Sequence, residues 1–269
     1  MFKDKVVWIT GASSGIGLAF AEAMHAEGAK LILSALTEDE LKPVAERLTG
    51  SVPIAFDVAD FDKLPALVEK AVAAFGRIDV LVNNAGITQR DEAKDTSFAV
   101  YRRLIDIDLM APIALTQLVL PHMIRQGSGR LIVMASIAGK FGAPLRTAYS
   151  AAKHGIFGYF DALRTEVGHR GIEVHVIAPG SVRTNLARNA LTGEGKAFGK
   201  TDDFIEGGYD PAYLIDRALC DIKRGKREIV IVRGLEGKMV TLRRFFPELS
   251  FKIMLKKAPA FLEEFHASK

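Results

Sequence analysis

Short apolar runs alternate with longer amphipathic segments along this chain of 269 residues, which limits the folds open to it. The apolar runs lack the in-and-out alternation of a half-exposed strand, so they indicate strands that are buried on both faces. They lie at residues 6–9, 31–33, 53–56, 80–82, 131–134, 174–177 and 229–232. Helical patterns fill the gaps at residues 17–27, 38–48, 61–75, 98–125, 147–167 and 209–223. This spacing predicts right-handed crossovers and a single α/β domain, a doubly wound parallel sheet of about seven strands with helices on both faces.

Two segments break this pattern and set the predicted domain organisation. Residues 185–208 are polar and rich in glycine, and a loop of that length inside a compact domain is usually functional or disordered. Residues 222–269 hold 12 basic and 5 acidic side chains, although the whole chain carries a net charge of only +4. We therefore expect a catalytic or binding domain over residues 1–232 and a basic, aromatic-rich extension over residues 233–269.

The composition excludes several classes of protein. Hydrophobic residues make up 49% of the chain and charged residues 25%, enough apolar surface to exclude disorder as the dominant state. A single cysteine, Cys220, excludes a disulfide framework and a cysteine-rich zinc site, and we expect no metal. The sequence has no secretory signal pattern and no uninterrupted apolar run of about 18 residues, so we expect a cytoplasmic protein.

Two glycine-containing turns follow predicted strands. The sequence TGASSGIG at residues 10–17 follows the first strand and opens the first helix. Glycines at such a turn let the backbone approach a pyrophosphate, which the helix N-terminus attracts. The sequence NNAG at residues 83–86 follows the fourth strand, where ligands of open α/β sheets bind. Each turn taken alone is also typical of an ordinary loop.

Tyr149 and Lys153 stand four residues apart in a predicted helix, so their side chains share one face. An ammonium group near a phenol favours the phenolate, and a tyrosine in that setting can act as a general acid or base. Ser136 precedes Tyr149 by 13 residues, at the end of another predicted strand. For Tyr149 and Lys153 in isolation, a surface pair without function is the alternative.

In their order along the chain, these motifs resemble the short-chain dehydrogenase/reductase family. The shared pattern is TGxxxGxG, NNAG, a serine, YxxxK and PGxVxT, the last at residues 179–184, and it spans roughly residues 4–232. The resemblance implies a Rossmann fold and an NAD(P)-dependent oxidoreductase that interconverts a carbonyl and an alcohol. In such enzymes the cofactor carries the hydride, while the protein supplies position and a proton.

The resemblance also assigns roles to particular residues. Tyr149 would protonate the carbonyl oxygen or deprotonate the alcohol, Lys153 would bond the nicotinamide ribose, and Ser136 would hold the substrate oxygen. The residues implied in cofactor binding are Gly11, Ser13, Ser14, Ile16 and Gly17 at the pyrophosphate, Asp57 and Val58 at the adenine, Asn84, Ala85 and Gly86 in the cleft, and Tyr149, Lys153, Pro179, Gly180, Val182 and Thr184 at the nicotinamide end.

Asp108 is a first departure from the family, in which many members carry asparagine at this fourth catalytic position. There the main-chain carbonyl anchors a water in a proton relay to the lysine, a role that survives the substitution. An ionised carboxylate accepts hydrogen bonds but cannot donate them, so a buried Asp108 would need a donor or a raised pKa. We expect activity to persist with an altered relay; the alternative is that Asp108 only bonds a neighbouring helix.

The end of the second strand is a second departure and bears on cofactor choice. NAD-preferring members usually place an acid there, which repels a 2′-phosphate, but this chain has Ala35 followed by Leu36. The basic residue that selects NADP in other members is also missing, and Ser14 stands in its place in the glycine-rich loop. The hydroxyls of Ser34 and Thr37 could bind a phosphate. We expect NADP as the preferred cofactor, with NAD as the alternative.

The segment 185–208 lies where the family keeps its substrate lid, and its glycines suit a mobile cover. Apolar side chains that could form the inner face of this lid and its surroundings are Leu186, Leu191, Phe198, Phe204, Ile205, Ile137 and Phe141. They favour a hydrophobic or lipid-like carbonyl or alcohol over a sugar, although most pockets are mainly apolar.

The extension interleaves apolar side chains with cations and allows two interpretations. One is a basic amphipathic anchor at an anionic membrane, which would make the protein membrane-associated. The other, which we favour, is a helical extension packed on the body or on a partner subunit, because Pro247 and Pro259 prevent one long continuous helix. Nucleic-acid binding is not expected, since the overall charge is modest and the cofactor cleft already explains the site.

We therefore expect an NAD(P)-dependent reductase or dehydrogenase that acts on a hydrophobic small molecule. Two alternatives remain: a non-catalytic dinucleotide-binding sensor or scaffold on the same fold, and a membrane-surface binding protein that acts through its basic tail. The long helices at residues 98–125 and 147–167 correspond to helices that pair across a dimer axis in the family. By that resemblance we expect a homodimer or homotetramer.

Overall fold

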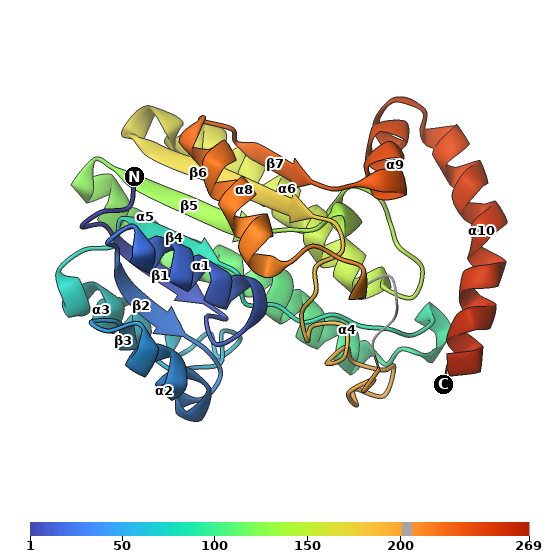
Figure 1. Ribbon diagram of the computed structural model, residues 1–269, viewed down its shortest axis with the longest axis horizontal. Helices are drawn as coiled ribbons and strands as arrows, with labels where there is room; N and C mark the ends of the chain where they lie inside the picture. The colour runs from blue at the N-terminus through green and yellow to red at the C-terminus, as the bar shows by residue number, and fades with distance from the viewer. Residues whose placement is uncertain (201–205, 269) are drawn as a thin grey trace.

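Seven parallel strands form one sheet in the computed structural model, which describes residues 1–200 and 206–268. Their order is β3-β2-β1-β4-β5-β6-β7, so the chain changes direction across the sheet between β1 and β4 (Figure 1). The strands are β1 (Val6–Thr10), β2 (Lys30–Ser34), β3 (Val52–Pro53), β4 (Val80–Asn83), β5 (Gly129–Met134), β6 (Ile172–Pro179) and β7 (Glu228–Ile231). The predicted doubly wound, Rossmann-type parallel sheet is confirmed.

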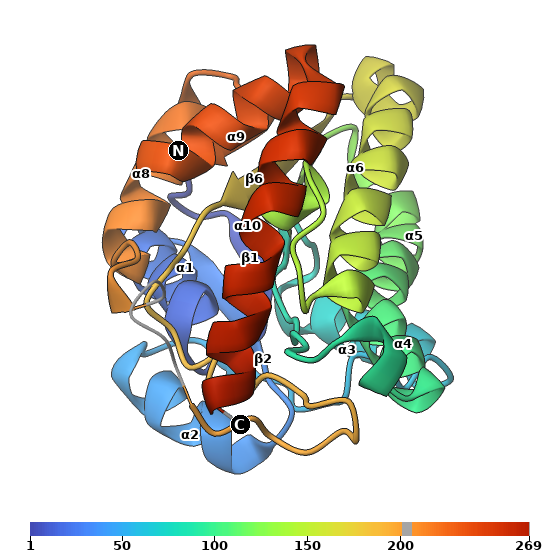
Figure 2. The ribbon, with the colours of Figure 1, turned by 90° about the vertical axis from the view of Figure 1, so that its right-hand side faces the viewer.

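Helices bury both faces of this sheet, which explains the uninterrupted apolar runs. Side chains of β1 alternate between two cores: Val7 and Ile9 enter one, and Val6 and Trp8 enter the other. The first core lies under α1 (Gly15–Ala26), α2 (Glu38–Arg47) and α8 (Pro211–Lys223), and the second under α3 (Leu64–Phe75), α5 (Ala111–Gln126) and α6 (Thr147–Val167). Figure 2 shows these two helical layers on opposite sides of the sheet.

The edge strand β3 is shorter than the predicted strand at residues 53–56. Pro53 has no N–H group to donate to a ladder, and β3 has a neighbour on one side only. The segment nevertheless follows β2 further, because the N–H groups of Ile54 and Phe56 donate to the carbonyls of Leu33 and Ala35. The apolar run therefore marks the correct position in the sheet but a longer strand than the ladder allows.

The helix predicted over residues 98–125 contains a change of winding. It begins as α4 (Phe98–Ile105), passes through a π-helical turn at Asp106–Met110 and continues as α5. The whole segment Phe98–Gln126 is long and apolar enough to cross a membrane. Its inner side chains, among them Leu115, Val119 and Met123, are buried against the sheet, as in a core helix of the fold. Shorter 3₁₀ turns occur at Ala93–Asp95, Ile137–Gly139 and Gly168–Arg170.

The described part of the segment 185–208 lies against the loop that follows β4. Leu191 donates its N–H to the carbonyl of Thr88 at 2.8 Å, and its own carbonyl accepts from Arg90 at 2.9 Å. Phe198 turns back on the same segment, its N–H donating to the carbonyl of Ala190. Phe204 and Ile205, expected on the inner face of a lid, lie outside the described residues.

Two helices, α9 (Gly234–Phe245) and α10 (Pro247–Ser268), follow the last strand. They lie beyond the carboxyl ends of the strands, with α10 running across that end of the molecule (Figures 1 and 2). Pro247 separates the two helices as expected, but the prediction that Pro259 would also interrupt the extension is wrong. Pro259 has no N–H group to donate to the carbonyl of Leu255. Leu255 is exposed, so water can donate to that carbonyl instead.

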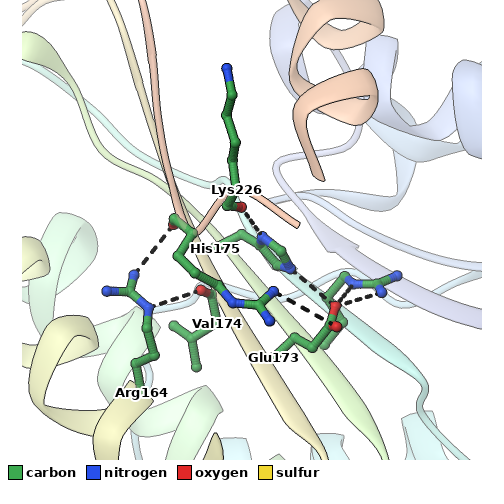
Figure 3. Close-up of polar contacts among 7 residues, drawn as sticks. Arg164, Glu173, Val174, His175 and Lys226 are labelled. Atoms are coloured by element: carbon green, nitrogen blue, oxygen red, sulfur yellow. Dashed lines mark hydrogen bonds and ion pairs between the residues drawn. The ribbon is translucent and has the colours of Figure 1, made fainter. Parts of the chain in front are cut away.

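A polar cluster joins β5, β6 and β7 at the opposite end of the strands (Figure 3). Arg130 donates two hydrogen bonds to Glu173, at 2.8 and 2.6 Å, and Glu173 also lies 3.2 Å from Nε2 of His175. Nδ1 of the buried His175 lies 2.7 Å from the carbonyl oxygen of Lys226. The imidazole is thus part of the packing between the last two strands.

The free energy of unfolding should decrease as the pH falls through the ordinary pKa of histidine, about 6.5. Burial lowers the pKa of His175, outweighing its bonds to Lys226 and Glu173, so the unfolded chain binds a proton that the native state excludes. In denaturant unfolding between pH 7.5 and 5.5, His175→Asn should lose less stability than the unchanged protein. The exposed His169→Asn is the control, and equal slopes for all three proteins would contradict the prediction.

Candidate active site

A cavity of about 760 Å³ opens at the carboxyl ends of the strands. Its walls come from the loops that follow β1, β4, β5 and β6, from α6, and from α9 and α10. The carboxyl ends of parallel strands meet at one edge of a sheet, so residues far apart in sequence converge there. Of the residues predicted to act at the site, the cavity is lined by Gly11, Ser13, Ser14, Ile16, Asn84, Ala85, Gly86, Asp108, Ser136, Tyr149, Lys153, Pro179, Gly180, Val182 and Thr184.

The glycine-rich turn is held close to the NNAG turn in a way that side chains would prevent. Gly11 has a φ angle of +65°, and a Cβ atom on it would lie 3.0 Å from the amide nitrogen of Asn84. A Cβ atom on Gly17 would lie 2.0 Å from the carbonyl oxygen of Gly11. Gly17 is buried beneath the turn instead of lining the cavity, and it lets α1 begin directly behind the turn. The N-terminal N–H groups of α1 are thereby available to an anion.

Asn84 joins these two turns through hydrogen bonds. Its side-chain amide donates to the carbonyl oxygens of Thr10 and Gly11, at 3.0 and 3.2 Å. The hydroxyl of Thr10 accepts from the backbone N–H groups of Asn84 and Ala85, at 3.0 and 3.1 Å. The asparagine therefore fixes the shape of the cleft floor, whatever else it contacts when a ligand is bound.

Tyr149 and Lys153 lie on one face of α6 and point into the cavity, as their spacing predicts. The Nζ atom of Lys153 lies 5.5 Å from the centre of the Tyr149 ring. Ser136 caps the 3₁₀ turn after β5, where its hydroxyl accepts from the N–H of Ala138 at 3.1 Å. The hydroxyl, the phenol and the ammonium group thus line the same cavity.

Lys153 is almost completely buried and lies between two oxygen atoms. Its Nζ atom is 3.0 Å from Oδ1 of Asp108 and donates to the carbonyl oxygen of Met134, also at 3.0 Å. Burial alone would lower the pKa of Lys153, but the charges of Asp108 and Tyr149 outweigh it and raise that pKa. Burial raises the pKa of Asp108, and the nearby ammonium group only partly opposes this effect. Asp108 thus has the donors that a buried carboxylate needs, since its Oδ2 also accepts from the N–H of Ile87.

The π-helical turn carries Asp108 toward α6. Asp108 is fully buried, and a Cβ atom on Gly86 would lie 2.6 Å from its Oδ1. The carboxylate therefore needs a glycine in the NNAG turn. π-helical turns are rare and occur frequently at functional sites.

Besides Gly17, three predicted cofactor contacts do not line this cavity. The hydroxyl of Ser34 accepts a hydrogen bond from Nε1 of Trp8 at 2.9 Å inside the core, and only 1% of Ser34 is exposed. A ligand phosphate cannot reach that hydroxyl in this structure, so the structure contradicts the proposed role of Ser34. The side chain alternation of β2, which sends Ser34 inward, is the reason. Asp57 and Val58 do not line the cavity. Burial alone would raise the pKa of Asp57, but the N–H of Ala59 and the guanidinium group of Arg103, at 2.7 Å, together lower it.

The cavity also contains residues that the sequence motifs did not indicate. Glu236 of α9 accepts from the N–H and the hydroxyl of Ser181, both at 3.2 Å, and burial raises the pKa of this carboxyl group. Further lining side chains come from the loops and from the extension: Arg90, Arg146, Leu235, Met239, Met254, Lys257, Ala258, Phe261 and Glu264. The amphipathic pattern of the tail could have suggested an inward-facing side, but nothing in the sequence says which cavity it faces.

Comparisons with known proteins relate the chain to a family. A family model described as short chain dehydrogenase matches residues 5–195. Dehydrogenase/reductase SDR family member 7B of Danio rerio is 36% identical, over 95% of this chain and 86% of its own length. Dehydrogenase/reductase SDR family protein 7-like of Drosophila melanogaster is also 36% identical, over 94% of this chain and 80% of its own length.

Solved structures support the fold. A short chain dehydrogenase/reductase from Burkholderia phymatum in complex with NAD superposes with a TM-score of 0.82 at 23% identity, covering 92% of this chain and 95% of that chain. Levodione reductase superposes with a TM-score of 0.77 at 28% identity, covering 87% of this chain and 98% of its own. With the family match and the curated relatives, these findings show that the chain belongs to the short-chain dehydrogenase/reductase family.

Proposed function

We propose that this protein is an NAD(P)-dependent oxidoreductase that interconverts a carbonyl and an alcohol on a hydrophobic small-molecule or lipid-like substrate, with Tyr149 as the general acid and base. The observation that supports it best is the convergence of Ser136, Tyr149 and Lys153 on one cavity, beside the N-terminus of α1. A non-catalytic sensor or scaffold would not need a hydroxyl, a phenol and a buried ammonium group directed at the same space.

The turns of this cavity fit a nicotinamide dinucleotide. Gly11, Ser13 and Ile16 would hold the pyrophosphate, because they line the cavity in the turn that leads into the N-terminus of α1, where free N–H groups favour an anion. Pro179 and Gly180, which line the cavity at the end of β6, would contact the nicotinamide. When bound, the cofactor supplies or accepts the hydride. The described residues contain no cluster of His, Cys, Asp and Glu that could hold a metal ion, and the proposal involves none.

The protein's own groups would handle the proton and the substrate oxygen. The Ser136 hydroxyl donates a hydrogen bond to that oxygen and holds it beside the phenol. Tyr149 gives its proton to the oxygen in reduction and takes it back in oxidation. The Lys153 ammonium group, 5.5 Å from the ring, stabilises the phenolate that remains. Asp108 and the carbonyl of Met134 position this ammonium group, so the lysine keeps its proton and its place during turnover.

The apolar part of the lining supports a hydrophobic substrate. Ile137 and Phe141 follow Ser136, and Leu186 comes from the segment 185–208. Met239, Met254 and Phe261 add apolar surface from the C-terminal helices. Such walls exclude water from the reacting carbonyl and bind hydrocarbon better than a sugar.

The end of β2 supports a preference for NADP over NAD. Ala35 stands where a carboxylate would repel the 2′-phosphate, and the following Leu36 is exposed. Without Ser34, whose hydroxyl is buried, Thr37 is the hydroxyl that remains for a phosphate there, and it caps the first turn of α2. The proposed preference therefore depends on the missing repulsion more than on a dedicated phosphate site.

Tyr149→Phe should lower the turnover of a hydrophobic ketone by about 10²–10⁴-fold, because the ring remains but the proton donor is lost. The measurement is steady-state oxidation of NADPH, with NADPH affinity determined separately by fluorescence. Tyr159→Phe, on the same helix, is the matched control and should retain turnover. Undiminished turnover in Tyr149→Phe would refute the mechanism, and cofactor binding without any turnover in the unchanged protein would favour the sensor.

NADPH should bind more tightly than NADH in a fluorescence titration of the purified protein. Ala35→Asp should weaken NADPH binding by roughly tenfold or more, since it places a carboxylate near the 2′-phosphate, while changing NADH binding little. Ala35→Asn has nearly the same shape without the charge and is the control. Tighter binding of NADH by the unchanged protein would overturn the preference for NADP.

Asp108→Asn should keep measurable activity but move the alkaline limb of the pH–turnover profile to lower pH. The reason is that the Asp108 carboxylate raises the pKa of Lys153, and asparagine removes that charge while keeping an oxygen acceptor. Asp108→Ala should be far less stable to denaturant, because it leaves a buried cation without its ion partner. An unchanged pH profile in Asp108→Asn would show that the carboxylate does not influence the reaction.

A further inference from the structure

The C-terminal helices expose an unusual amount of apolar surface. Half of the large apolar side chains that are exposed in the described residues belong to these two helices and the turn between them, seven of fourteen. They are Leu235, Phe245, Phe246, Leu249, Phe251, Leu255 and Phe261. Together with the cations Arg244, Lys252 and Lys256, we call them the C-terminal surface. Phe246 is 62% exposed and Leu255 73%, although removing such side chains from water is favourable in free energy.

Cations stand beside these apolar side chains in a regular arrangement. Phe251 and Leu255 occupy one row of α10, four residues apart, and Lys252 and Lys256 occupy the adjacent row. Arg244 precedes Phe245 and Phe246 at the end of α9. Within the described part of the chain, no ion pair joins Arg244, Lys252 or Lys256 to a carboxylate. The cations are therefore available to an anionic partner.

The opposite side of α10 is already occupied. Ser250 and Phe265 are buried near its two ends, and the ring of Phe265 stacks on that of Phe198 with 6.0 Å between centres. His266 contacts Glu92 at 2.8 Å. Between these two fixed points, Met254, Ala258 and Phe261 line the cavity. The outward rows therefore belong to a helix that the protein holds in place, and not to a free tail.

We propose that the C-terminal surface docks the protein on an anionic membrane and places the mouth of the cavity beside the lipid. Aromatic and aliphatic side chains next to cations are the pattern of helices that lie in the lipid headgroup region, where the cations meet anionic headgroups. A second copy of this chain is the poorer partner, because a two-fold contact would bring the same cations together.

The cavity connects to this surface. Leu235 and Phe261 both line the cavity and are exposed to solvent, so the cavity wall reaches the C-terminal surface at α9 and α10. A hydrophobic substrate dissolved in the lipid could enter there without crossing water. This second step rests on the proposed function, whereas the membrane contact itself does not.

The test is co-sedimentation of the full chain with vesicles of neutral phosphatidylcholine, alone or mixed with phosphatidylserine, over a range of salt concentrations. The protein should bind the vesicles that contain phosphatidylserine, and added salt should weaken this binding. Lys252→Gln with Lys256→Gln should weaken it roughly thirtyfold, and Phe246→Ser with Leu255→Ser should abolish it. Lys42→Gln with Lys70→Gln, exposed on α2 and α3, is the matched control and should bind like the unchanged protein.

The remaining outcomes separate this proposal from its alternatives and from the proposed function. Absence of binding, or binding that the α10 variants do not weaken, overturns it, and equal binding to neutral vesicles overturns its electrostatic part. If the same variants change the molar mass measured by light scattering and no vesicle binding occurs, the surface joins subunits and the proposal is wrong. Tyr149→Phe should still bind vesicles, so the membrane test can be interpreted even if the proposed catalytic mechanism is wrong. Conversely, the α10 variants that lose vesicle binding should turn over a water-soluble ketone like the unchanged protein.

Discussion

Burial of the Lys153 ammonium group is the constraint on which the site depends. A cation removed from water needs compensating oxygen atoms, and here they are the carboxylate of Asp108 and the carbonyl of Met134. The ring of Tyr149 adds a more distant contact, with its centre 5.5 Å from Nζ. Removal of one partner of a buried ion pair costs about 3–5 kcal/mol. The end of β5, the π-helical turn and α6 are thus held together by the same charge that the proposed chemistry uses.

The same constraint extends to the glycines around the cleft. Asp108 reaches Lys153 only because Gly86 has no side chain, and the NNAG turn that carries Gly86 is bound through Asn84 to the turn after β1. The turn after β1 itself requires glycine at positions 11 and 17. The proposed cofactor cradle and the proposed proton-transfer site therefore depend on one continuous set of close backbone approaches.

The amino-acid sequence was sufficient to predict the sheet and most residues of the cavity. It was insufficient where the direction of a side chain or a contact with a distant segment determines the outcome. Parallel strands buried on both faces require apolar runs, so these runs located all seven strands. Motifs located residues at the strand ends and on one face of α6, because both positions bring side chains to the cavity. The predicted phosphate contact of Ser34 is absent because the pleat of β2 directs its hydroxyl to Trp8. The predicted break at Pro259 is absent because a helix tolerates proline where the freed carbonyl meets water. Glu236 and Phe261 belong to no motif, since only tertiary packing carries their helices to the cavity.

The C-terminal helices link specificity to the surroundings of the protein. The proposed catalytic groups come from the loop after β5 and from α6, whereas apolar wall that a substrate would touch also comes from α9 and α10. One side of α10 forms this wall and the other carries Lys252, Leu255 and Lys256 toward the outside. Whatever binds the outer rows therefore acts on a helix that also shapes the cavity. Because Ser250 and Phe265 fix α10 near both its ends, an external contact on its outer rows would alter access to the cavity while the proposed catalytic residues on α6 keep their geometry.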